Sequence, residues 1–554
     1  MRRLLELTAL TGLAIAQPLL DTLAGAPEAF VFHEVTGATL VAFVAIVAFG
    51  PPLVLWCLEL LAGIASERLV RIVHPVVLSA LAGLFLYQLA AQLTSMASLV
   101  LVGAGIAGGV AFSQLYRLAA VRQWLAVLAV VPVLAAGGFL AGSPVLRMSG
   151  ELAMDEVRGA SGSASDHSVV MVIWDELPLA TLLDADGGID PVLFPNLARL
   201  ADDGAWFRNA TTVGTVTSIA VPAMLTGRYP THGLAPVASD HPRNLFTLVA
   251  GSHQLRASEQ ITSLCPRALC SDLEEGRAGA GESPSGLSAM LGEAISLYET
   301  MLTDPGAEAA PQAFVEGVSP LDPDAVADAL RDDVVGGAAP AYQVDGFENL
   351  LASIEPDEDP TLHFLHLQLP HTPYRFLPSG QAYQSEDFGG GMAVEGYGVR
   401  SEDEMALITD RQRLLLQTMF VDQLVGQLIE RLEETGLYDD SIVVMTSDHG
   451  IGLEPGQPKR PLFDDEVPEE ILADLLWVPL LIKAPGLEPG TVRDDNVMTV
   501  DVLPTVAELL GIELAWDVEG ISLVSGQRDD ETKYFHRVTE HEPDMSGFQV
   551  AIKP

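Results

Sequence analysis

Residues 209–230 read N-A-T-T-V-G-T-V-T-S-I-A-V-P-A-M-L-T-G-R-Y-P, in which small hydroxyl residues lead into a short apolar segment. This pattern predicts a loop that enters a helix through a hydroxyl cap, and a helix that ends at Gly227. Hydroxyl groups at a helix start lie near the positive end of the helix dipole, which also attracts an anionic ester. Pro222 conflicts with a regular helix here, because a proline beyond the first turn removes a helical hydrogen bond.

Two interpretations are open for these hydroxyl residues. They are ordinary loop and capping residues, which is the default at a helix start, or one of them is the nucleophile of an enzyme. The residues concerned are Thr211, Thr212, Thr215, Thr217 and Ser218.

The surrounding sequence resembles a known family. Residues 194–230, with F-P-N-L-A-R-L-A-D-D-G-A-W-F-R-N-A and L-T-G-R-Y-P, resemble the start of the sulfatase branch of the alkaline phosphatase superfamily. Within them, G-T-V-T-S-I-A-V-P-A-M at residues 214–224 is similar to the nucleophile segment of the membrane-bound lipid A phosphoethanolamine transferases, where the second Thr is phosphorylated. The resemblance implies that Thr217 is the catalytic nucleophile.

The same position separates this chain from ordinary sulfatases. The sulfatase pattern C-x-P-S-R-x-x-L-x-T-G-R places a modified Cys or Ser where this sequence has Thr217, and the P-S-R that follows is absent. A threonine cannot be oxidised to the formylglycine aldehyde that sulfatases use. The sequence therefore argues against formylglycine-dependent hydrolysis of sulfate esters.

Most of the apolar excess of this chain, which is 49% hydrophobic, lies before residue 150. Five segments there have the roughly 17 to 25 residues that a membrane span needs. A cleaved signal peptide is the alternative for the first segment, which follows a basic start, but its length and the four later segments favour a span. The segments are residues 4–24, 37–61, 73–93, 97–115 and 124–140.

The arginines of this region predict its orientation. They precede the first segment and lie between the second and third and between the fourth and fifth, while the other two connections contain no Lys or Arg. The positive-inside rule then places the N-terminus in the cytoplasm and, with five spans, everything after Leu140 outside the cell membrane. A soluble protein with an apolar helical core does not explain this alternation. The arginines are Arg2, Arg3, Arg68, Arg71, Arg117 and Arg122.

Charge and cysteine content agree with an extracytoplasmic location. The first 150 residues contain seven of the 29 basic and six of the 74 acidic residues, so the remainder has 22 basic and 68 acidic residues and a net charge of −46. Such a surface repels nucleic acid, so no nucleic-acid partner is expected. Cys265 and Cys270 are close enough in sequence for a small disulfide loop in an oxidising compartment, whereas a two-Cys metal half-site lacks its other half.

A continuous apolar run at residues 168–176, S-V-V-M-V-I-W-D-E, predicts a buried strand of a parallel sheet. It ends at Asp175 and Glu176, and ligands in α/β sheets collect beyond the carboxyl ends of strands. Adjacent carboxylates repel each other unless a cation lies beside them. Taken alone, this pair is equally compatible with a helix N-cap and with a metal site.

A second run at residues 441–450, S-I-V-V-M-T-S-D-H-G, ends at Asp448 and His449. A carboxylate beside an imidazole favours zinc or manganese over calcium or magnesium, and T/S-D-H-G is similar to the superfamily's second metal motif. In the phosphoethanolamine transferases the acid that matches Glu176 is a ligand, so Glu176 is a stronger candidate than Asp175. The expected ligands of one divalent metal are Asp175, Glu176, Thr217, Asp448 and His449.

A third predicted strand, T-L-H-F-L-H-L-Q-L at residues 361–369, runs into P-H-T-P-Y. This turn resembles the family motif whose histidine contacts the transferred anion or protonates the leaving group, which implies a catalytic role for His371. His363 and His366 point to opposite faces of the sheet because their spacing is odd, so both are expected to be structural, with His366 as a candidate second substrate contact. Lys459 and Arg460 are candidate substrate-binding cations, or an ordinary solvated pair.

The remaining elements are expected to be scaffold. The helical pattern at residues 406–435, the strand at 478–486 and the helix at 498–512 resemble elements of the sulfatase family. The resemblance covers about residues 168–523, and the five-span layout resembles phosphoethanolamine transferases and lipoteichoic acid synthases. The expected domains are a transmembrane domain at 1–145, a linker at 146–167, a catalytic domain at 168–525 with an acidic insertion at 272–360, and a tail at 526–554.

The sequence thus predicts a multi-span α-helical membrane domain of about five helices, followed by an α/β sulfatase-like (alkaline phosphatase-like) domain with a mostly parallel central sheet. The resemblance implies a metal-dependent enzyme of the cell membrane that transfers a phosphoethanolamine or phosphoglycerol headgroup from a phospholipid, through a phosphothreonine, to an envelope glycan or lipid. The alternative is a membrane-anchored, sulfatase-like hydrolase of sulfate or phosphate esters. A non-enzymatic scaffold would not need the acid, threonine and histidine set described above.

Overall fold

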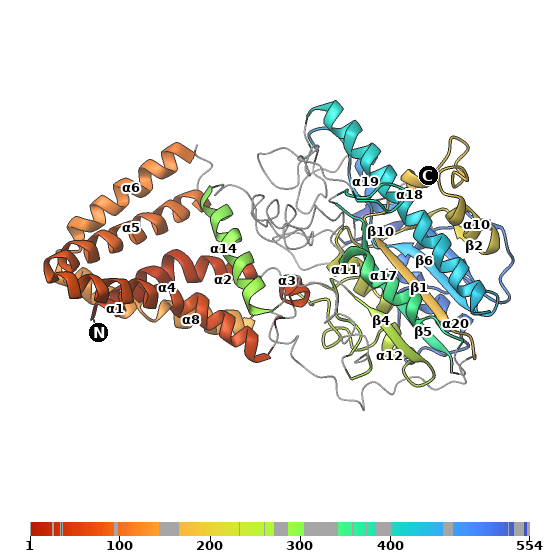
Figure 1. Cartoon of the computed structure of the whole chain (residues 1–554), viewed down its shortest axis with the longest axis horizontal. Helices are drawn as coiled ribbons and strands as arrows, with labels where there is room; N and C mark the ends of the chain where they lie inside the picture. Colours follow the sequence, from red (N-terminus) through yellow and green to blue (C-terminus); the bar gives the residue numbers. More distant parts are fainter. Residues whose placement is uncertain are drawn as a thin grey trace. The chain divides into compact units, whose positions relative to one another are not determined.

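The computed structural model describes most of the chain, and the described residues form two compact units (Figure 1). The first unit comprises Met1–Ser149 with Pro284–Ala327, and the second comprises Gly150–Ser283 with Asp328–Pro554. The described residues are 2–142, 165–270, 286–303, 342–382, 400–457, 469–536 and 548–550, apart from gaps at 25–26, 34, 36, 94–97, 232, 260, 267, 357–358, 373, 401 and 530.

The first unit is a bundle of apolar helices. By length and composition, four of them are suited to crossing a membrane, namely Arg2–Ala24, Gly37–Ile64, Glu67–Ala91 and Ala119–Ala141. The fourth predicted span corresponds to a shorter apolar helix, α6. The predicted multi-span helical domain is therefore confirmed, with four long helices and a shorter one. Its helices are α1 (Arg2–Thr11), η1 (Gly12–Ala16), α2 (Gln17–Ala24), α3 (Pro27–Phe32), α4 (Gly37–Ala65), α5 (Glu67–Leu93), α6 (Ser98–Leu115), α7 (Ala119–Leu128) and α8 (Val131–Gly142).

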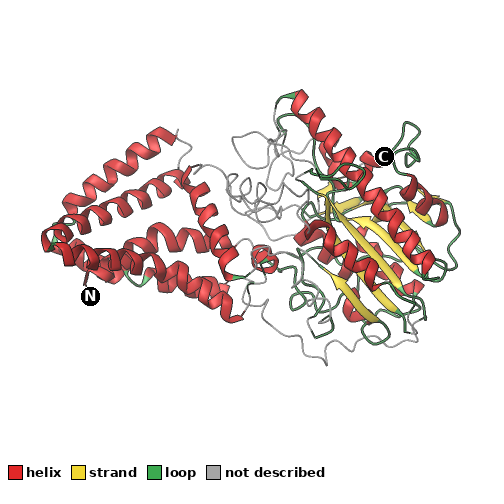
Figure 2. Ribbon diagram, viewed as in Figure 1, coloured by secondary structure: helices red, strands yellow, loops and turns green. Residues whose placement is uncertain are grey.

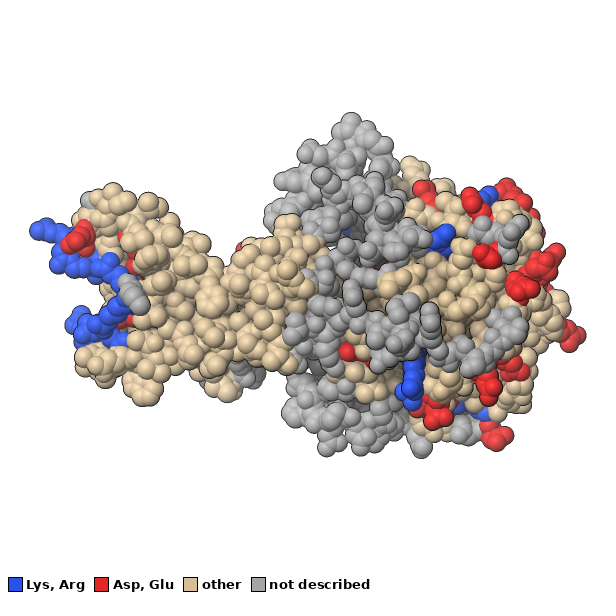
Figure 3. Space-filling model, turned by 90° about the horizontal axis from the view of Figure 1, so that it is seen from below, with Lys and Arg blue, Asp and Glu red and all other residues tan. Residues whose placement is uncertain are grey.

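The basic residues of this unit gather at one end of it. Figure 3 shows the Arg side chains of the helical bundle together at one end of it, and the rest of its visible surface is uncharged over a long stretch. The first 142 residues contain no Lys, and their six arginines are those that the sequence assigned to the cytoplasmic connections. The arginines, which occur in every second connection of the sequence, thus lie together at one end of the bundle.

A helix from the predicted acidic insertion, α14 (Leu287–Thr303), belongs to this first unit. Its residues Met290, Ala294 and Leu297 pack with apolar side chains of α2, α3 and α4. The Tyr298 hydroxyl donates a hydrogen bond to the carbonyl of Ala14 over 2.6 Å, and His33 pairs with Glu293. Part of the segment that the sequence assigned to the catalytic domain as an insertion therefore packs in the helical bundle.

The second unit contains a seven-stranded sheet in the order β4-β5-β1-β6-β7-β2-β8. β1 pairs in parallel with both β5 and β6, β4 is parallel to β5, and β2 is parallel to β8, while β7 is antiparallel to its neighbours β6 and β2. The predicted, mostly parallel central sheet is confirmed. The strands are β1 (Val169–Asp175), β2 (Ala205–Phe207), β4 (Gln254–Ser258), β5 (Thr361–Pro370), β6 (Ile442–Ser447), β7 (Leu480–Lys483) and β8 (Thr491–Arg493).

Helices cover both faces of this sheet (Figure 2). Successive side chains of β1 point to opposite faces, so Val169, Met171 and Ile173 enter one apolar core and Val170, Val172 and Trp174 enter the other. A central strand with two covered faces has no polar side, which explains its unbroken apolar run. One face carries α11 (Thr217–Thr226), α12 (Leu245–Val249) and α20 (Val502–Leu509), and the other carries α10 (Pro195–Asp203), α17 (Tyr342–Ser353) and α18 (Glu404–Glu434).

Smaller elements complete the unit. They are the short helices η3 (Leu179–Leu182), α19 (Glu469–Leu476) and η5 (Thr499–Asp501), and the two-stranded pairs β3 (Ala210–Thr211) with β9 (Val497–Met498) and β10 (Lys533–Phe535) with β11 (Phe548–Val550).

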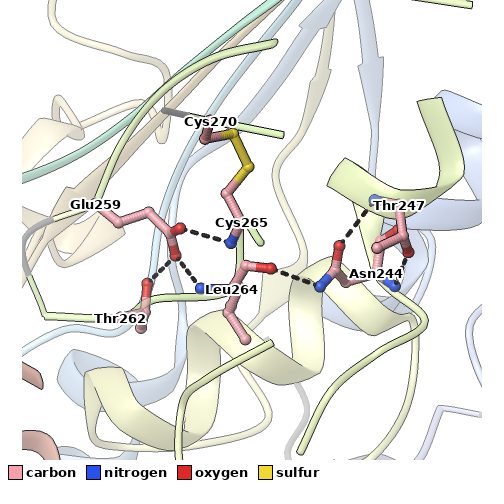
Figure 4. Close-up of a disulfide and its surroundings, with 7 residues drawn as sticks. All are labelled: Asn244, Thr247, Glu259, Thr262, Leu264, Cys265 and Cys270. Atoms are coloured by element: carbon pink, nitrogen blue, oxygen red, sulfur yellow. Dashed lines mark hydrogen bonds between the residues drawn. A yellow bond between two sulfur atoms is a disulfide. The ribbon is translucent and has the colours of Figure 1, made fainter. Parts of the chain in front are cut away.

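The two cysteines of the second unit form the expected disulfide, Cys265–Cys270. Figure 4 shows the polar contacts that fix its loop. The carboxylate of Glu259 accepts hydrogen bonds from the backbone N–H groups of Leu264 and Cys265, both over 2.8 Å, and from the Thr262 hydroxyl over 2.6 Å. A small loop held by a covalent bond and a buried carboxylate has little freedom to move.

Candidate active site

The carboxyl ends of three neighbouring strands, β5, β1 and β6, lie side by side in the sheet. β5 and β6 both run parallel to β1, on either side of it, so their carboxyl ends meet. Asp175 ends β1, Asp448 follows β6, and His371 follows β5. The predicted acids and histidine therefore converge, and every one of these side chains is buried.

Thr217 is the first residue of α11, and its side chain joins this group. Its hydroxyl donates a 2.7 Å hydrogen bond to Oδ2 of Asp448, and the residue is 2% exposed. The predicted hydroxyl cap is wrong, because the N-cap residue is Val216 and makes no side-chain cap. Pro222 is accommodated inside the helix, and Gly227 ends it with a φ of 66°. The threonine hydroxyl is thus directed at a carboxylate rather than at its own helix.

Asp448 is the centre of the hydrogen-bond network. Its Oδ1 accepts the backbone N–H of His449 over 2.7 Å and that of Glu176 over 3.2 Å. Burial alone would raise the pKa of this carboxyl, but the imidazoles of His449 and His366 and the Thr217 hydroxyl outweigh burial and hold the pKa below its usual range. The carboxylate is therefore ionised at neutral pH, which suits it to accept hydrogen bonds and to hold a cation.

Glu176 has the only positive φ, 61°, among the described non-glycine residues. A left-handed backbone is costly for a glutamate and clusters at functional sites. The Glu176 carboxylate accepts a long, 3.5 Å hydrogen bond from the backbone N–H of Thr372, and its Oε1 lies 3.6 Å from Nε2 of His371. The strained backbone thus turns the acid toward the histidine that was predicted to handle the leaving group.

A candidate metal site lies within this group. One ligand atom each from Asp175, His366 and Asp448 lie within 4.8 Å of one another. His366 is fully buried, both of its ring nitrogens lack a hydrogen bond among the described residues, and its Nε2 is 3.8 Å from Asp448 Oδ2. Buried polar groups are normally satisfied, and two carboxylates with an imidazole suit a divalent cation such as zinc or manganese. The residues present therefore fit a metal ion.

His366 was predicted only as a candidate substrate contact, because a histidine within an apolar strand is commonly structural. The structure separates it from His363, whose Nδ1 lies 3.0 Å from the Ser353 hydroxyl on the other face of β5. Burial lowers the pKa of His363 to about 4, so that ring is neutral. Strand periodicity predicted the opposite faces, but only the neighbouring strands reveal that His366 faces the acids.

Gln417 of α18 positions the loop that carries His371, a role that sequence reasoning missed. Its amide nitrogen donates to the carbonyls of Pro370 and His371, both over 3.0 Å. Its amide oxygen accepts the backbone N–H groups of Arg375 and Phe376 over 2.7 and 3.1 Å. A glutamine in a long helical pattern gives no local signal for this role.

Arg400 is a second missed residue, and it is 1% exposed. Its Nε donates to the carbonyl of Gly452 over 2.9 Å, and its Nη1 lies 3.4 Å from Asp410 Oδ2. Burial raises the pKa of the neighbouring Tyr374, and the charge of Arg400 partly opposes that rise. A permanent cation thus lies close to the turn that follows His449. The predicted cations Lys459 and Arg460 lie outside the described residues.

Several known proteins are similar to parts of this chain. Residues 323–512 match the family model described as Sulfatase. Curated relatives include the low-salt glycan biosynthesis sulfotransferase Agl7 of Haloferax volcanii, 26% identical over 34% of this chain and 42% of that protein. Lipoteichoic acid synthase 1 of Bacillus subtilis is 31% identical over 20% of this chain and 18% of that protein. Arylsulfatase K of Xenopus laevis is 34% identical over 19% of this chain and 18% of that protein.

Among solved structures, a phosphonate monoester hydrolase from Silicibacter pomeroyi is 21% identical, with a TM-score of 0.43 over 67% of this chain and 79% of that one. The chain spans about a fifth to two fifths of the length of the curated relatives named here. The match at residues 323–512 agrees with the sulfatase resemblance that the sequence motifs predicted. The matched residues include His371, Asp448 and His449, whereas Asp175 and Thr217 precede the matched range.

Proposed function

We propose that this chain is a membrane-bound, metal-dependent transferase that moves a phosphoethanolamine or phosphoglycerol headgroup from a phospholipid to an envelope glycan or lipid, through a phosphothreonine at Thr217. The observation that carries the proposal is the 2.7 Å hydrogen bond between the Thr217 hydroxyl and Asp448 Oδ2. An alcohol becomes a useful nucleophile when a base accepts its proton. Asp448 accepts the hydrogen bond of this hydroxyl and so orients Oγ1, and a divalent cation held beside it would lower the pKa of the hydroxyl far enough for a weak base to take the proton.

In the first step, Thr217 Oγ1 forms a bond to phosphorus and the bond from phosphorus to the diacylglycerol oxygen breaks. The hydroxyl proton moves toward Asp448 Oδ2, and His371 donates a proton to the departing oxygen. A divalent cation held by Asp175, His366 and Asp448, with Glu176 and His449 beside it, would lower the pKa of the hydroxyl and neutralise phosphate charge. The products are diacylglycerol and a phosphodiester on Thr217.

In the second step, an acceptor hydroxyl attacks the phosphorus, and the bond to Thr217 Oγ1 breaks. His371 now accepts the proton of the acceptor, and Thr217 regains a proton as it leaves. If water replaces the acceptor, the same residues hydrolyse the ester. That hydrolase is the second candidate, and the relatives named as sulfatases favour it.

The proposed orientation places the N-terminus in the cytoplasm and the catalytic domain outside. The clustered arginines of the first unit and the Cys265–Cys270 disulfide support it, because basic residues are retained inside and disulfides persist in oxidising compartments. Thiol labelling of intact cells before and after reduction tests the orientation. An impermeant reagent should label Cys265 and Cys270 only after external reduction, and labelling only after lysis would contradict it.

The transfer itself is tested by peptide mass spectrometry. Metal-loaded, detergent-purified protein is incubated with mixed phospholipids, and the peptide that contains Thr217 is examined. We expect a phosphoethanolamine or phosphoglycerol adduct on Thr217 that is lost in Thr217→Ala and kept in Ser218→Ala. An adduct on Ser218, or none during turnover, would overturn the nucleophile assignment and favour direct hydrolysis.

A further inference from the structure

A cavity of about 450 Å³ lies beside α11 in the second unit. One wall follows this helix from Ser218 through Pro222 to Thr226, and the catalytic group around Asp448 does not line it. Ser218 directly follows Thr217, and a helix advances about 1.5 Å per residue, so the cavity extends roughly 14 Å from the nucleophile. It is therefore placed to hold a part of a substrate that lies beyond the reacting phosphorus.

Two cations line the cavity in a domain where acids outnumber basic residues. Arg228 and Arg243 are both exposed there, while Asp240 is the only acid among the described lining residues. Arg228 donates its Nε to the carbonyl of Asp517 over 3.1 Å, and its terminal nitrogens have no described hydrogen bond. Arg243 makes no hydrogen bond or ion pair that the described residues reveal. Their charge is thus available to an anion.

The wall that carries Arg243 is held rigidly. The buried side chain of Asn244 caps α12 by accepting the N–H of Thr247 over 3.1 Å. Its amide nitrogen donates to the carbonyls of His241 and Leu264, both over 2.8 Å. Figure 4 shows that Leu264 belongs to the loop fixed by the disulfide and Glu259. The disulfide loop therefore supports the cavity wall, and a preformed wall reduces the entropy lost on binding.

The end of the cavity around Arg228 is fixed in a similar way. Gly227 takes the left-handed conformation that turns the chain out of α11, and its carbonyl accepts the N–H groups of Glu519 and Gly520 over 2.9 and 3.1 Å. The carboxylate of Glu519 accepts the N–H of Tyr229 over 3.1 Å. The backbone is thus hydrogen-bonded at Gly227 and at Tyr229, the two residues that flank Arg228.

The remaining lining mixes hydroxyl, ring and apolar groups. Ser218, Tyr229 and His241 supply polar atoms, and Ile219 and Leu234 supply apolar surface. Burial lowers the pKa of His241 to about 4, so this ring forms hydrogen bonds without adding charge at neutral pH. A sugar ring has hydroxyls at its edge and C–H groups on its faces, so it matches such a lining. Acyl chains of a phospholipid do not match it.

We propose that this cavity binds an anionic saccharide of the acceptor, with Arg228 and Arg243 holding its carboxylate or sulfate groups. This inference rests on the proposed function in one respect, the identity of the ligand as the acceptor. The binding site itself does not depend on it. An extended acceptor would place a hydroxyl near Thr217 while its anionic sugars occupy the cavity.

Equilibrium binding to the full-length, detergent-purified protein tests the site. The probes are a galacturonic acid tetrasaccharide, its neutral methyl ester and a sulfated galactose tetrasaccharide, at fixed ionic strength. We expect the acid probes to bind and the ester to bind at least tenfold more weakly. Arg243→Gln and Arg228→Gln should each weaken acid binding about tenfold, as expected for one charge-assisted hydrogen bond.

Arg208→Gln is the matched control, because this exposed arginine pairs with Asp494 and does not line the cavity. Arg243 has no described contact, so its substitution does not threaten the fold, and melting temperatures check this for Arg228→Gln. The preference between carboxylate and sulfate probes identifies the acidic group. Wild-type affinity in both variants, equal binding of the neutral ester, or no binding by wild type would each overturn the proposal.

Half-reaction assays separate this inference from the proposed function. Formation of the Thr217 adduct from phospholipid should be unchanged in Arg243→Gln, whereas the KM for transfer to an anionic glycan should rise about tenfold at similar kcat. Absence of the adduct in wild type, with intact probe binding, would refute the transfer mechanism and leave the cavity standing. A normal KM in the variant would refute the cavity and leave the mechanism standing.

Discussion

Two buried clusters of carboxylate and imidazole groups, one in each unit, differ in how their polar atoms are satisfied. In the helical bundle, His74 lies between two acids, with Nδ1 2.7 Å from Glu59 Oε1 and Nε2 3.0 Å from Glu6 Oε2. Glu6 also accepts hydrogen bonds from Tyr116 and Arg2. In the catalytic unit, His366 faces Asp448 across 3.8 Å, and neither ring nitrogen has a hydrogen bond among the described residues.

The difference indicates which cluster needs an ion. In the first cluster both ring nitrogens of His74 are hydrogen-bonded to an acid, so neither nitrogen is left to bind an ion. In the second cluster two carboxylates lie near a histidine whose ring nitrogens make no hydrogen bond with any described residue. Burying such groups costs folding free energy unless a cation is bound. We therefore interpret the first cluster as a clasp between α1, α4 and α5, and the second as a metal site.

The largest expected effect is on catalysis. Thr217→Ala and Asp448→Asn should each lower adduct formation and phosphodiester cleavage at least about a thousandfold, or about 4 kcal/mol of transition-state stabilisation. Steady-state and single-turnover rates on a phospholipid and on a soluble phosphodiester measure this. Ser218→Ala is the control, with a near-normal rate, and an active Asp448→Asn would remove this carboxylate from the proposed mechanism.

The clasp should respond through stability. His74→Leu leaves Glu6 and Glu59 buried without their partner, which should cost about 3 kcal/mol of folding free energy and should be visible as a lower melting temperature of the full chain in detergent. Replacing all three residues by Leu should recover most of the loss, because no unpaired charge remains. An unchanged melting temperature in His74→Leu would show that the cluster does not hold these helices together.

Metal binding should distinguish the clusters directly. Elemental analysis should find about one zinc or manganese ion in wild type and in His74→Leu, and much less in Asp175→Asn or His366→Ala. Added metal at a hundred times its dissociation constant should stabilise the stripped wild type by about 2.7 kcal/mol. Full metal content in His366→Ala would assign that histidine to substrate binding instead.

A smaller effect is expected at the loop that joins β5 to the site. Gln417→Leu removes four hydrogen bonds to the chain around His371 and should lower kcat about tenfold, or about 1.4 kcal/mol, with unchanged metal content. The exposed Gln427→Leu on the same helix is the matched control. A rise in KM alone, with normal kcat, would place Gln417 in substrate binding rather than in positioning His371.

Local patterns in the sequence predicted the elements and the ends of strands at which the site forms. Apolar runs that stop at Asp175 and at Asp448 identify central strands, because a strand covered on both faces has no polar positions. Long apolar runs likewise identified the helices of the first unit, and the arginines between them predicted their orientation. These features depend on neighbouring residues in the chain, so one sequence suffices to read them.

Other features depended on which elements became neighbours. His366 is a site residue only because β5 lies beside β1, and Gln417 contacts the His371 loop only because α18 packs against β5. The helix α14 follows β4 in the chain, yet it packs with the first unit. Such contacts join residues far apart in sequence, and their energies depend on packing and burial that no local pattern encodes.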